Sequence, residues 1–133
     1  MTGVQTCALP ISPNDPTHPL LGAPRGDLLI EGSWSVRLAS QGHNVPHTHA
    51  MGWLSTAFYV ALPQPDEMGL PPAGHIAFGQ PPEELGLALG PYRTITPEPG
   101  KLAVFPSTMW HATVPFDQGE RLVIAFDIRR PKA

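Results

Sequence analysis

Short segments in which apolar and polar residues alternate recur along the chain, and turns rich in proline and glycine separate them. Alternation with a period of two is typical of β-strands that bury one face. The pattern predicts strands at residues 27–31, 33–38, 53–62, 74–79, 92–96, 101–105, 110–115 and 121–128. About eight short strands with regular turn signals and few or no helices predict an all-β sandwich or barrel.

The connections between these strands differ in length. Residues 63–73 and 80–91 predict two long surface loops rich in proline, and residues 83–87 favour a single helical turn within the second loop. Tight turns are predicted at residues 97–100, which end in Gly100, and at residues 117–120, which contain Gly119. The 18 prolines of the chain lie mostly between apolar runs, where β proteins place them.

The last predicted strand has two faces of different character. One face carries Arg121, Val123 and Ala125, and the other carries Leu122, Ile124, Phe126 and Ile128. An arginine among small apolar neighbours predicts a position inside the fold, where an unpaired charge is costly and a bound carboxylate would relieve that cost. A surface arginine beside Glu120 is the alternative interpretation.

Composition narrows the class of protein. A chain of 133 residues with 41% hydrophobic and 14% charged residues has enough apolar material for one domain. A net charge of −3 with scattered basic residues predicts no nucleic-acid partner. The apolar runs are too short to cross a bilayer, so we expect no membrane association. A single cysteine fits a reducing cytoplasm.

The first part of the chain is expected to differ from the rest. Residues 1–12 resemble a translated sequencing adapter, which makes them a non-native leader and implies that the natural N-terminus is missing. They lack the basic and apolar regions of a signal peptide. Residues 13–32 read as a proline-rich linker with a partial strand, and residues 33–133 as the folded domain.

Three histidines form the strongest candidate for chemistry. His47 and His49 are separated by one residue on an extended segment, so their side chains point the same way and can bind one ion. His111, at the start of a later strand, could supply a third ligand. Three ligands on one face leave the opposite face open, which suits a catalytic iron better than a closed structural zinc.

Other residues are weaker candidates. His43, in a turn, and His75, at the start of a strand, are spare ligand candidates, and His18 is expected on the surface. Tyr59 and Ser55 are four residues apart on one strand and therefore share a face, from which either hydroxyl could bind a small molecule. The three tryptophans, Trp34, Trp53 and Trp110, are expected in the core or at its rim.

Several segments, taken in order, carry a specific resemblance. They are residues 33–36, 41–49, 53–60, 74–78, 99–107, 110–111 and 120–127. Together they are similar to a bacterial family of 2-oxoglutarate- and iron(II)-dependent oxygenases, over nearly all of residues 33–128. The resemblance implies a double-stranded β-helix, a variant of the jelly roll.

The same resemblance implies roles for individual residues. His47 matches the first iron ligand and His111 the distal histidine, while Arg121 matches the residue that binds the distal carboxylate of 2-oxoglutarate. His49 falls where the wider superfamily has a carboxylate, so a three-histidine site would have one negative charge fewer. The implied cofactors are Fe(II) and 2-oxoglutarate. The implied partners are that cosubstrate, O2 and an unknown primary substrate, whose C–H bond is oxidised as 2-oxoglutarate becomes succinate.

Two rival functions stay open. Gly100, Pro106 and His111 have the spacing of the second motif of cupin metal enzymes, although residues 50–53 lack the glutamate of the first motif. A jelly-roll binding module without a metal is the rival outside enzymes.

Oxygenases of this fold usually cover the outer sheet face with N-terminal helices. Because the chain offers none, we expect the apolar face with Ile124 to be exposed and to promote self-association.

Overall fold

The computed structural model of the protein describes residues 15–18, 22–23 and 27–132. The chain divides into a small unit, Met1–Asp27 with Pro131–Ala133, and a large unit, Leu28–Arg130. In the small unit, the backbone N–H of Thr17 donates a hydrogen bond to Asp15 Oδ1 at 2.9 Å, which stabilises a turn. The adapter-like residues 1–12 lie outside the described residues, so their predicted behaviour stays a prediction.

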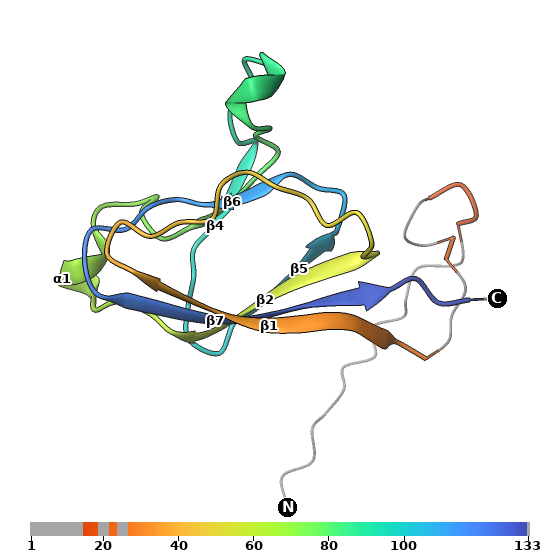
Figure 1. Cartoon of the computed structure of the whole chain (residues 1–133), viewed down its shortest axis with the longest axis horizontal. Helices are drawn as coiled ribbons and strands as arrows, with labels where there is room; N and C mark the ends of the chain where they lie inside the picture. The colour runs from red at the N-terminus through yellow and green to blue at the C-terminus, as the bar shows by residue number, and fades with distance from the viewer. Residues whose placement is uncertain (1–14, 19–21, 24–26, 133) are drawn as a thin grey trace, which may run out of the picture. The chain divides into compact units, whose positions relative to one another are not determined.

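In the described part of the chain, the large unit contains seven strands in two antiparallel sheets (Figure 1). The first sheet has the order β1-β7-β2-β5 and consists of β1 (Leu29–Ala39), β7 (Glu120–Arg129), β2 (Leu54–Ala61) and β5 (Leu102–Pro106). The second has the order β4-β3-β6 and consists of β4 (Arg93–Ile95), β3 (Ile76–Phe78) and β6 (His111–Thr113). The predicted all-β architecture is confirmed.

Two strands predicted separately, at residues 27–31 and 33–38, form the single strand β1, so the prediction of two strands is wrong. β1 pairs with β7 from Leu29 opposite Arg129 to Ala39 opposite Glu120, with an irregularity between Ile30 and Gly32. Glycine inside a strand often marks such a bulge. Gly32 interrupts the alternation of the sequence but does not end the hydrogen-bonded ladder.

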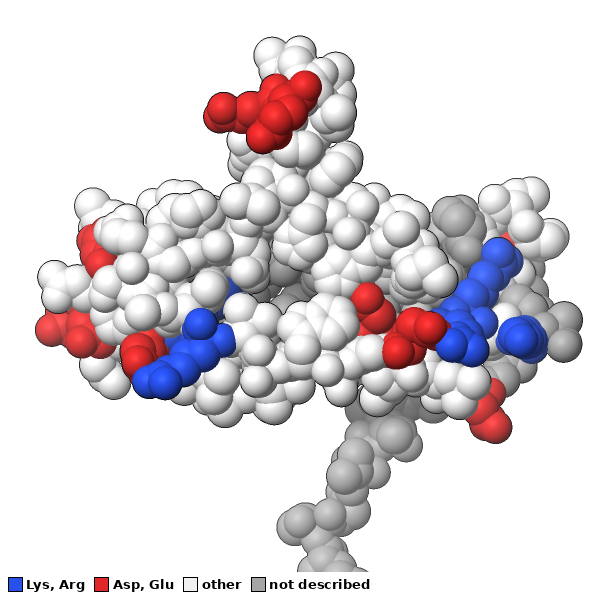
Figure 2. Space-filling view, in the orientation of Figure 1, with Lys and Arg blue, Asp and Glu red and all other residues white. Residues whose placement is uncertain are grey.

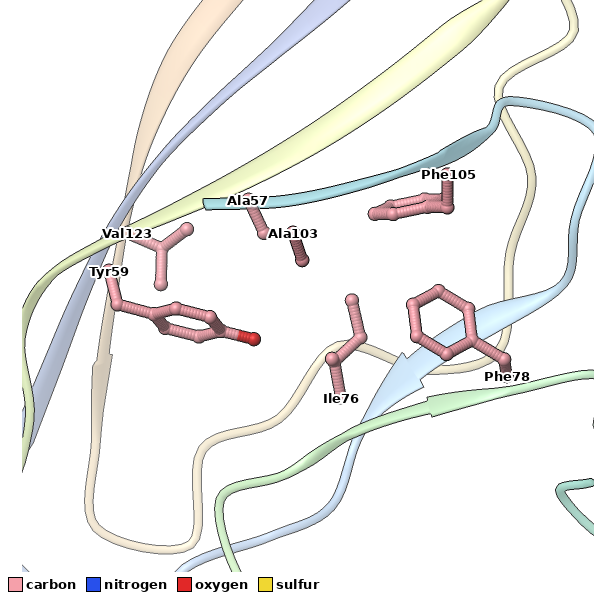
Figure 3. Packing of buried hydrophobic residues seen from close by; sticks show 7 residues of the cluster. All are labelled: Ala57, Tyr59, Ile76, Phe78, Ala103, Phe105 and Val123. Carbon is pink, nitrogen blue, oxygen red and sulfur yellow. The ribbon is translucent and has the colours of Figure 1, made fainter. Parts of the chain in front are cut away.

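The hydrophobic core lies between the inner faces of the two sheets (Figure 3). It consists of Ala57, Tyr59, Ile76, Phe78, Ala103, Phe105 and Val123. On β2, β3 and β5 these residues occur at every second position, as expected for strands with one face toward the core. The rings of Phe78 and Phe105 pack edge to face across the two sheets, with centroids 5.0 Å apart.

The loops contain two short helical elements. The helix α1 (Pro65–Met68) lies in the first long loop, where the sequence predicted only irregular structure. Pro65 at the first helical position and the capping interaction of Gln64 with Glu67 explain this local turn. The 3-10 helix η1 (Glu83–Leu85) confirms the predicted helical turn in the second loop, and its segment projects from the sheets (Figure 1).

The outer face of the first sheet is apolar and partly open to solvent. Leu102, Val104 and Ile124 are 46%, 53% and 43% exposed, and the β2–β5 and β2–β7 registers place them around Thr56 and Phe58. The predicted exposure of Ile124 is therefore confirmed, whereas the other residues of the same face, Leu122, Phe126 and Ile128, are half-buried.

In the view of Figure 2, charged side chains gather towards the two ends and on the segment with η1, and the centre is largely uncharged.

Candidate metal centre

His47, His49 and His111 come together in space, with one ring nitrogen of each lying within 4.8 Å of the others. His47 and His111 are joined by two backbone hydrogen bonds, each N–H donating to the other residue's carbonyl at 3.0 Å. The N–H of His49 donates to the Ser107 carbonyl at 2.9 Å. Backbone hydrogen bonds thus hold the three residues side by side, and the centroids of their rings are 4.2–5.1 Å apart.

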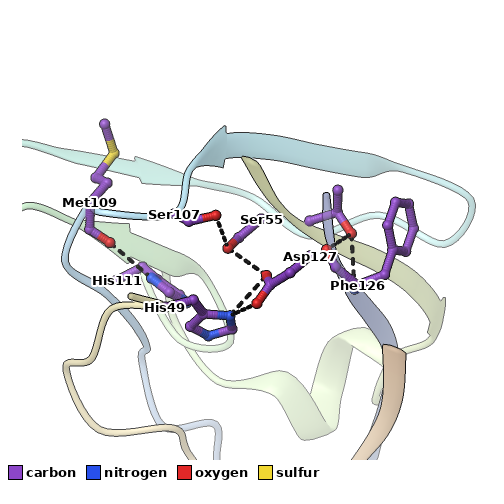
Figure 4. Close-up of polar contacts among 8 residues, drawn as sticks. His49, Ser55, Ser107, Met109, His111, Phe126 and Asp127 are labelled. Carbon is purple, nitrogen blue, oxygen red and sulfur yellow. Dashed lines mark hydrogen bonds and ion pairs between the residues drawn. The ribbon is translucent and has the colours of Figure 1, made fainter. Parts of the chain in front are cut away.

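The hydrogen bonds of the three rings determine which nitrogen is free. His47 Nδ1 lies 2.7 Å from the Val45 carbonyl and His111 Nδ1 lies 3.0 Å from the Met109 carbonyl. A carbonyl only accepts hydrogen bonds, so both Nδ1 atoms carry the proton. His49 Nδ1 donates instead to the Asp127 carboxylate, at 2.7 and 2.9 Å (Figure 4). In each ring Nε2 is therefore the nitrogen left without one of these hydrogen bonds, and it is the atom that can bind a metal when the imidazole is neutral.

Burial also prepares His111 for metal binding. The ring is 7% exposed and packs against Phe105, with centroids 4.6 Å apart. This burial lowers the pKa of His111 to about 4, and the Met109 carbonyl offsets part of the shift. The imidazole is therefore neutral at physiological pH, so a metal ion need not displace a proton from it.

A buried arginine lies in the same cavity as the histidines. The cavity has a volume of about 100 Å³, and its lining includes His47, His49, His111, Thr113 and Arg121. Arg121 is 3% exposed, as the predicted inner position on β7 requires. Its Nη1 donates to Thr113 Oγ1 at 2.9 Å, and its guanidinium carbon lies 5.2 Å from the centre of the Tyr59 ring.

Two buried polar atoms have no hydrogen-bond partner among the described residues: Arg121 Nε, in the cavity lining, and the hydroxyl of Tyr59, whose ring lies beside the guanidinium. Arg121 also forms no ion pair with any described residue. Burial lowers the pKa of Arg121 and raises the pKa of Tyr59, because each environment disfavours the charged form. An orphaned donor and a buried cation together indicate a place for an anionic ligand.

Ser55 faces the interior with Tyr59, as strand parity predicted, but its contacts differ from the expected ones. Ser55 Oγ lies 2.6 Å from Asp127 Oδ1 and 2.8 Å from Ser107 Oγ (Figure 4). Since a hydroxyl has one proton, Ser55 donates to the carboxylate and accepts from Ser107. The side chain is 1% exposed and orients Asp127 within the structure.

Of the other candidates, only Trp34 is among the residues that line the cavity of the three histidines. His43 is exposed in its predicted turn, where its Nδ1 contacts the Gln41 carbonyl at 3.1 Å. His75 is half-buried, and burial lowers its pKa. Trp34 lines the cavity, with its ring 5.4 Å from that of His49, so it is a rim residue. Trp53 and Trp110 are half-buried.

The sequence interpretation missed Asp127, Thr113 and Ser107. Asp127 follows Arg121, Val123 and Ala125 at the same two-residue spacing, so parity already placed a carboxylate on the inner face of β7. That signal could have identified Asp127. Thr113 and Ser107 gave no such signal, because small hydroxyl residues are common in strands and turns.

The two-sheet fold, the three histidines and the buried arginine define a jelly-roll protein with a candidate metal and anion site. The chain belongs to the family described as "Putative 2OG-Fe(II) oxygenase", whose model matches residues 32–127. The resemblance found in the sequence is therefore confirmed, and the family description names the expected cofactors, iron(II) and 2-oxoglutarate (2OG). No curated protein sequence matches the chain.

Solved structures share this fold. An oxidoreductase of the 2OG-Fe(II) oxygenase family from Burkholderia pseudomallei has a TM-score of 0.62 at 15% identity, with 84% of this chain and 49% of that chain covered. A Pseudomonas putida prolyl-4-hydroxylase has a TM-score of 0.54 at 21% identity, with 75% and 51% covered.

A viral collagen prolyl hydroxylase from Paramecium Bursaria Chlorella virus-1, solved as a 2OG complex, has a TM-score of 0.53 at 16% identity, with 80% and 62% covered. The similarity to these structures confirms the jelly-roll fold. The chain spans about half the length of the first two of them. Among the described residues, the structure contains no helix with the length and apolar character needed to span a membrane.

Proposed function

We propose that the protein is a 2OG- and iron(II)-dependent dioxygenase of the hydroxylase type, in which His47, His49 and His111 hold the iron. The observation that carries this proposal is the combination in one cavity of three converging histidine nitrogens and a buried arginine without a carboxylate partner. Family membership supports the reaction class, because the family description names both 2OG and iron.

The donor set fits iron(II). Three neutral imidazoles on one side of an ion leave positions for a chelating ligand and for oxygen, the arrangement of non-haem iron oxygenases. The hydrogen bonds at all three Nδ1 atoms hold the rings in the tautomer that binds metal through Nε2. A closed structural zinc site would instead need a fourth protein ligand, and the group of described histidine, cysteine and acidic residues contains three.

Arg121 gives the cavity a group that fits 2OG. The planar guanidinium of Arg121 can form two parallel hydrogen bonds with the distal carboxylate, using the Nε that lacks a partner. Tyr59, whose hydroxyl is also without a partner, can donate to the same carboxylate. Thr113 holds the guanidinium from the other side and limits its motion. Ser55 acts through Asp127 and does not contact the cosubstrate in this proposal.

When bound, iron supplies the activation of oxygen that couples oxidative decarboxylation of 2OG to C–H oxidation, with succinate and carbon dioxide as products. The protein residues orient the reactants and keep water out. Arg121 fixes one end of 2OG, so that its keto acid end reaches the histidines. Ala57, Ile76, Phe105 and Val123 make the cavity walls apolar, which strengthens the charged interactions inside.

The test begins with protein purified without oxygen. We expect about one equivalent of iron per chain and slow succinate release from 2OG alone. Replacement of His47, His49 or His111 by alanine should lower iron content and turnover together, whereas His43→Ala, an exposed histidine near the site in sequence, should leave both unchanged. Absence of iron and of turnover in the parent protein would reject the oxygenase and favour a binding module. Iron without dependence on 2OG would favour a cupin-type enzyme.

Two further proposals concern the setting of the protein. The one cysteine, Cys7, lies in the adapter-like leader, so the rest of the given sequence has no cysteine for a disulfide, which supports a cytoplasmic location. The exposed outer face of the first sheet, with Leu102, Val104 and Ile124, supports self-association of the chain, because apolar patches on a sheet tend to be buried against a second surface. The primary substrate, which is not a nucleic acid in this proposal, is expected to contact the loops at residues 63–73 and 80–91.

A further inference from the structure

Asp127 is a buried carboxylate next to the candidate metal centre, to which the proposal above assigns only a hydrogen bond to His49. It lies on the inner face of β7, two positions beyond Ala125, and is 8% exposed. Its two oxygens lie 2.7 and 2.9 Å from His49 Nδ1, so the carboxylate accepts the proton of that ring nitrogen (Figure 4). These two residues are 78 positions apart in the chain, so the contact depends on the tertiary fold.

The carboxylate is held by a second layer of contacts. Ser55 donates to it at 2.6 Å, and Ser107 lies 2.8 Å behind Ser55. Gly52 closes the remaining side: a Cβ at this position would lie 2.5 Å from Ser107 Oγ and 3.2 Å from Asp127 Cγ. Only a residue without a side chain fits there unless the network moves. The orientation of Asp127 is therefore fixed before any metal binds.

The three histidines differ in one respect. The Nδ1 protons of His47 and His111 are donated to neutral backbone carbonyls, whereas that of His49 is donated to a charged carboxylate. A carboxylate at Nδ1 makes the opposite nitrogen, Nε2, a stronger electron donor, and such partners usually tune metal affinity. The site therefore contains two ordinary imidazole ligands and one that is backed by a negative charge.

We infer that Asp127 is a positioning residue that gives the three-histidine site its missing negative charge through His49. The inference rests on the proposed iron site but adds a residue to it. Asp127 is not one of the three converging residues; through its hydrogen bond it would fix the tautomer and the direction of His49 and increase the electron density at Nε2. A merely structural ion pair would stabilise the fold without changing how strongly the site binds a metal.

Co(II) is a suitable probe because it binds the same nitrogen ligands and has visible absorption bands that report ligand geometry. Asp127→Asn keeps the size of the side chain. Its amide oxygen can still accept from His49, and its NH2 group can donate to Ser55, so the variant removes mainly the charge. We expect Co(II) affinity to fall by about 10- to 100-fold, with shifted absorption bands. Asp66→Asn, an exposed change on α1, is the matched control and should leave both unchanged.

The same substitution in a His49→Asp background separates the orientation of His49 from general support of the fold. There a carboxylate is in the ligand position, so Asp127 has no histidine to orient. Asp127→Asn should then change Co(II) affinity by less than about twofold, against at least tenfold in the parent. An equal loss in both backgrounds would show that Asp127 only supports the fold and would overturn the inference. Unchanged affinity in the parent background would overturn it as well.

A measurement without metal gives an independent readout. Nitrogen NMR of the folded parent should show His49 protonated at Nδ1, and Asp127→Ala should allow both tautomers. An unaltered tautomer in Asp127→Ala would count against the inference. A parent protein that binds no Co(II) would overturn both this inference and the proposed iron site. Tight Co(II) binding with the same affinity in the parent and in Asp127→Asn would reject this inference alone and leave the proposed function intact.

Discussion

Arg121→Met separates the stability of the fold from the binding of cosubstrate. Arg121 is 3% exposed and forms no ion pair with any described residue; its contacts are the Thr113 hydroxyl and the Tyr59 ring. Without a ligand, the guanidinium is a buried cation with one orphaned donor. Methionine has a similar length, fills the same apolar space and needs no hydrogen bonds. The substitution therefore removes the charge and keeps most of the packing.

The expected magnitudes follow from these contacts. Replacing a buried ion pair with apolar residues of similar volume is often neutral or stabilising by about 1–4 kcal/mol, and Arg121 has no described ion-pair partner whose charge would be left behind. We expect the lower part of that range for Arg121→Met, because the hydrogen bond to Thr113 is lost as well. Loss of a buried charge pair with bound 2OG should weaken binding by about 2–5 kcal/mol, which is about 30-fold or more. The apo protein should thus become no less stable while cosubstrate affinity collapses.

The assay combines urea denaturation of the metal-free protein with calorimetric titration of 2OG in the presence of Co(II). Arg37→Met is the control, because Arg37 is an exposed arginine on the neighbouring strand, paired with Glu120. It should leave 2OG affinity unchanged. Arg121→Lys should recover only part of the binding, since an ammonium group cannot form two parallel hydrogen bonds. Unchanged 2OG affinity in Arg121→Met, or a loss of several kcal/mol in stability, would refute the reasoning.

Two other predictions concern pH and association. The pKa of His111 is about 4 in the folded protein against 6.5 for the free side chain, so the unfolded chain binds more protons between these two pH values. The metal-free protein should therefore become less stable as the pH falls from 6.5 to 4. The loss in free energy of unfolding should be at most about 3 kcal/mol, and less where solvent reaches the ring. Urea denaturation at pH 7 and pH 4 should show a smaller pH effect for His111→Asn, and equal slopes would contradict the assignment. Val104→Glu, on the exposed outer face, should reduce self-association in size-exclusion chromatography, whereas Glu98→Gln should not; identical elution of the parent and Val104→Glu would argue against that face as the contact.

Much of the fold was predictable because strand parity is a local property. The alternation of residues 121–128 placed Arg121 inside and Ile124 outside, and both positions are confirmed. The spacing of His47 and His49 predicted that their rings share a direction, and the two rings lie 5.1 Å apart. The presence of α1 was missed, since its single turn depends on capping by Gln64, a local contact without a periodic signal.

The partner of His49 was not predictable by the same means. Parity places Asp127 on the inner face of β7, but its distance to His49 depends on the register between β7 and β2, where Ser55 lies opposite Asp127. Register is set by long-range pairing, which one sequence does not reveal. The same limit applies to Thr113, whose contact with Arg121 joins two different sheets.

The position of β7 in the first sheet has a consequence for how the protein is made. β7 is the last strand in the described chain, yet it lies between β1 and β2 and carries both Arg121 and Asp127. During synthesis, β1 and β2 therefore emerge with unpaired edges and wait for residues 120–129. Until that strand pairs, the site lacks both the Arg121 guanidinium and the Asp127 carboxylate that contacts His49. A nascent chain stopped before it would present an open sheet to the quality-control machinery, and metal loading is expected to follow chain completion.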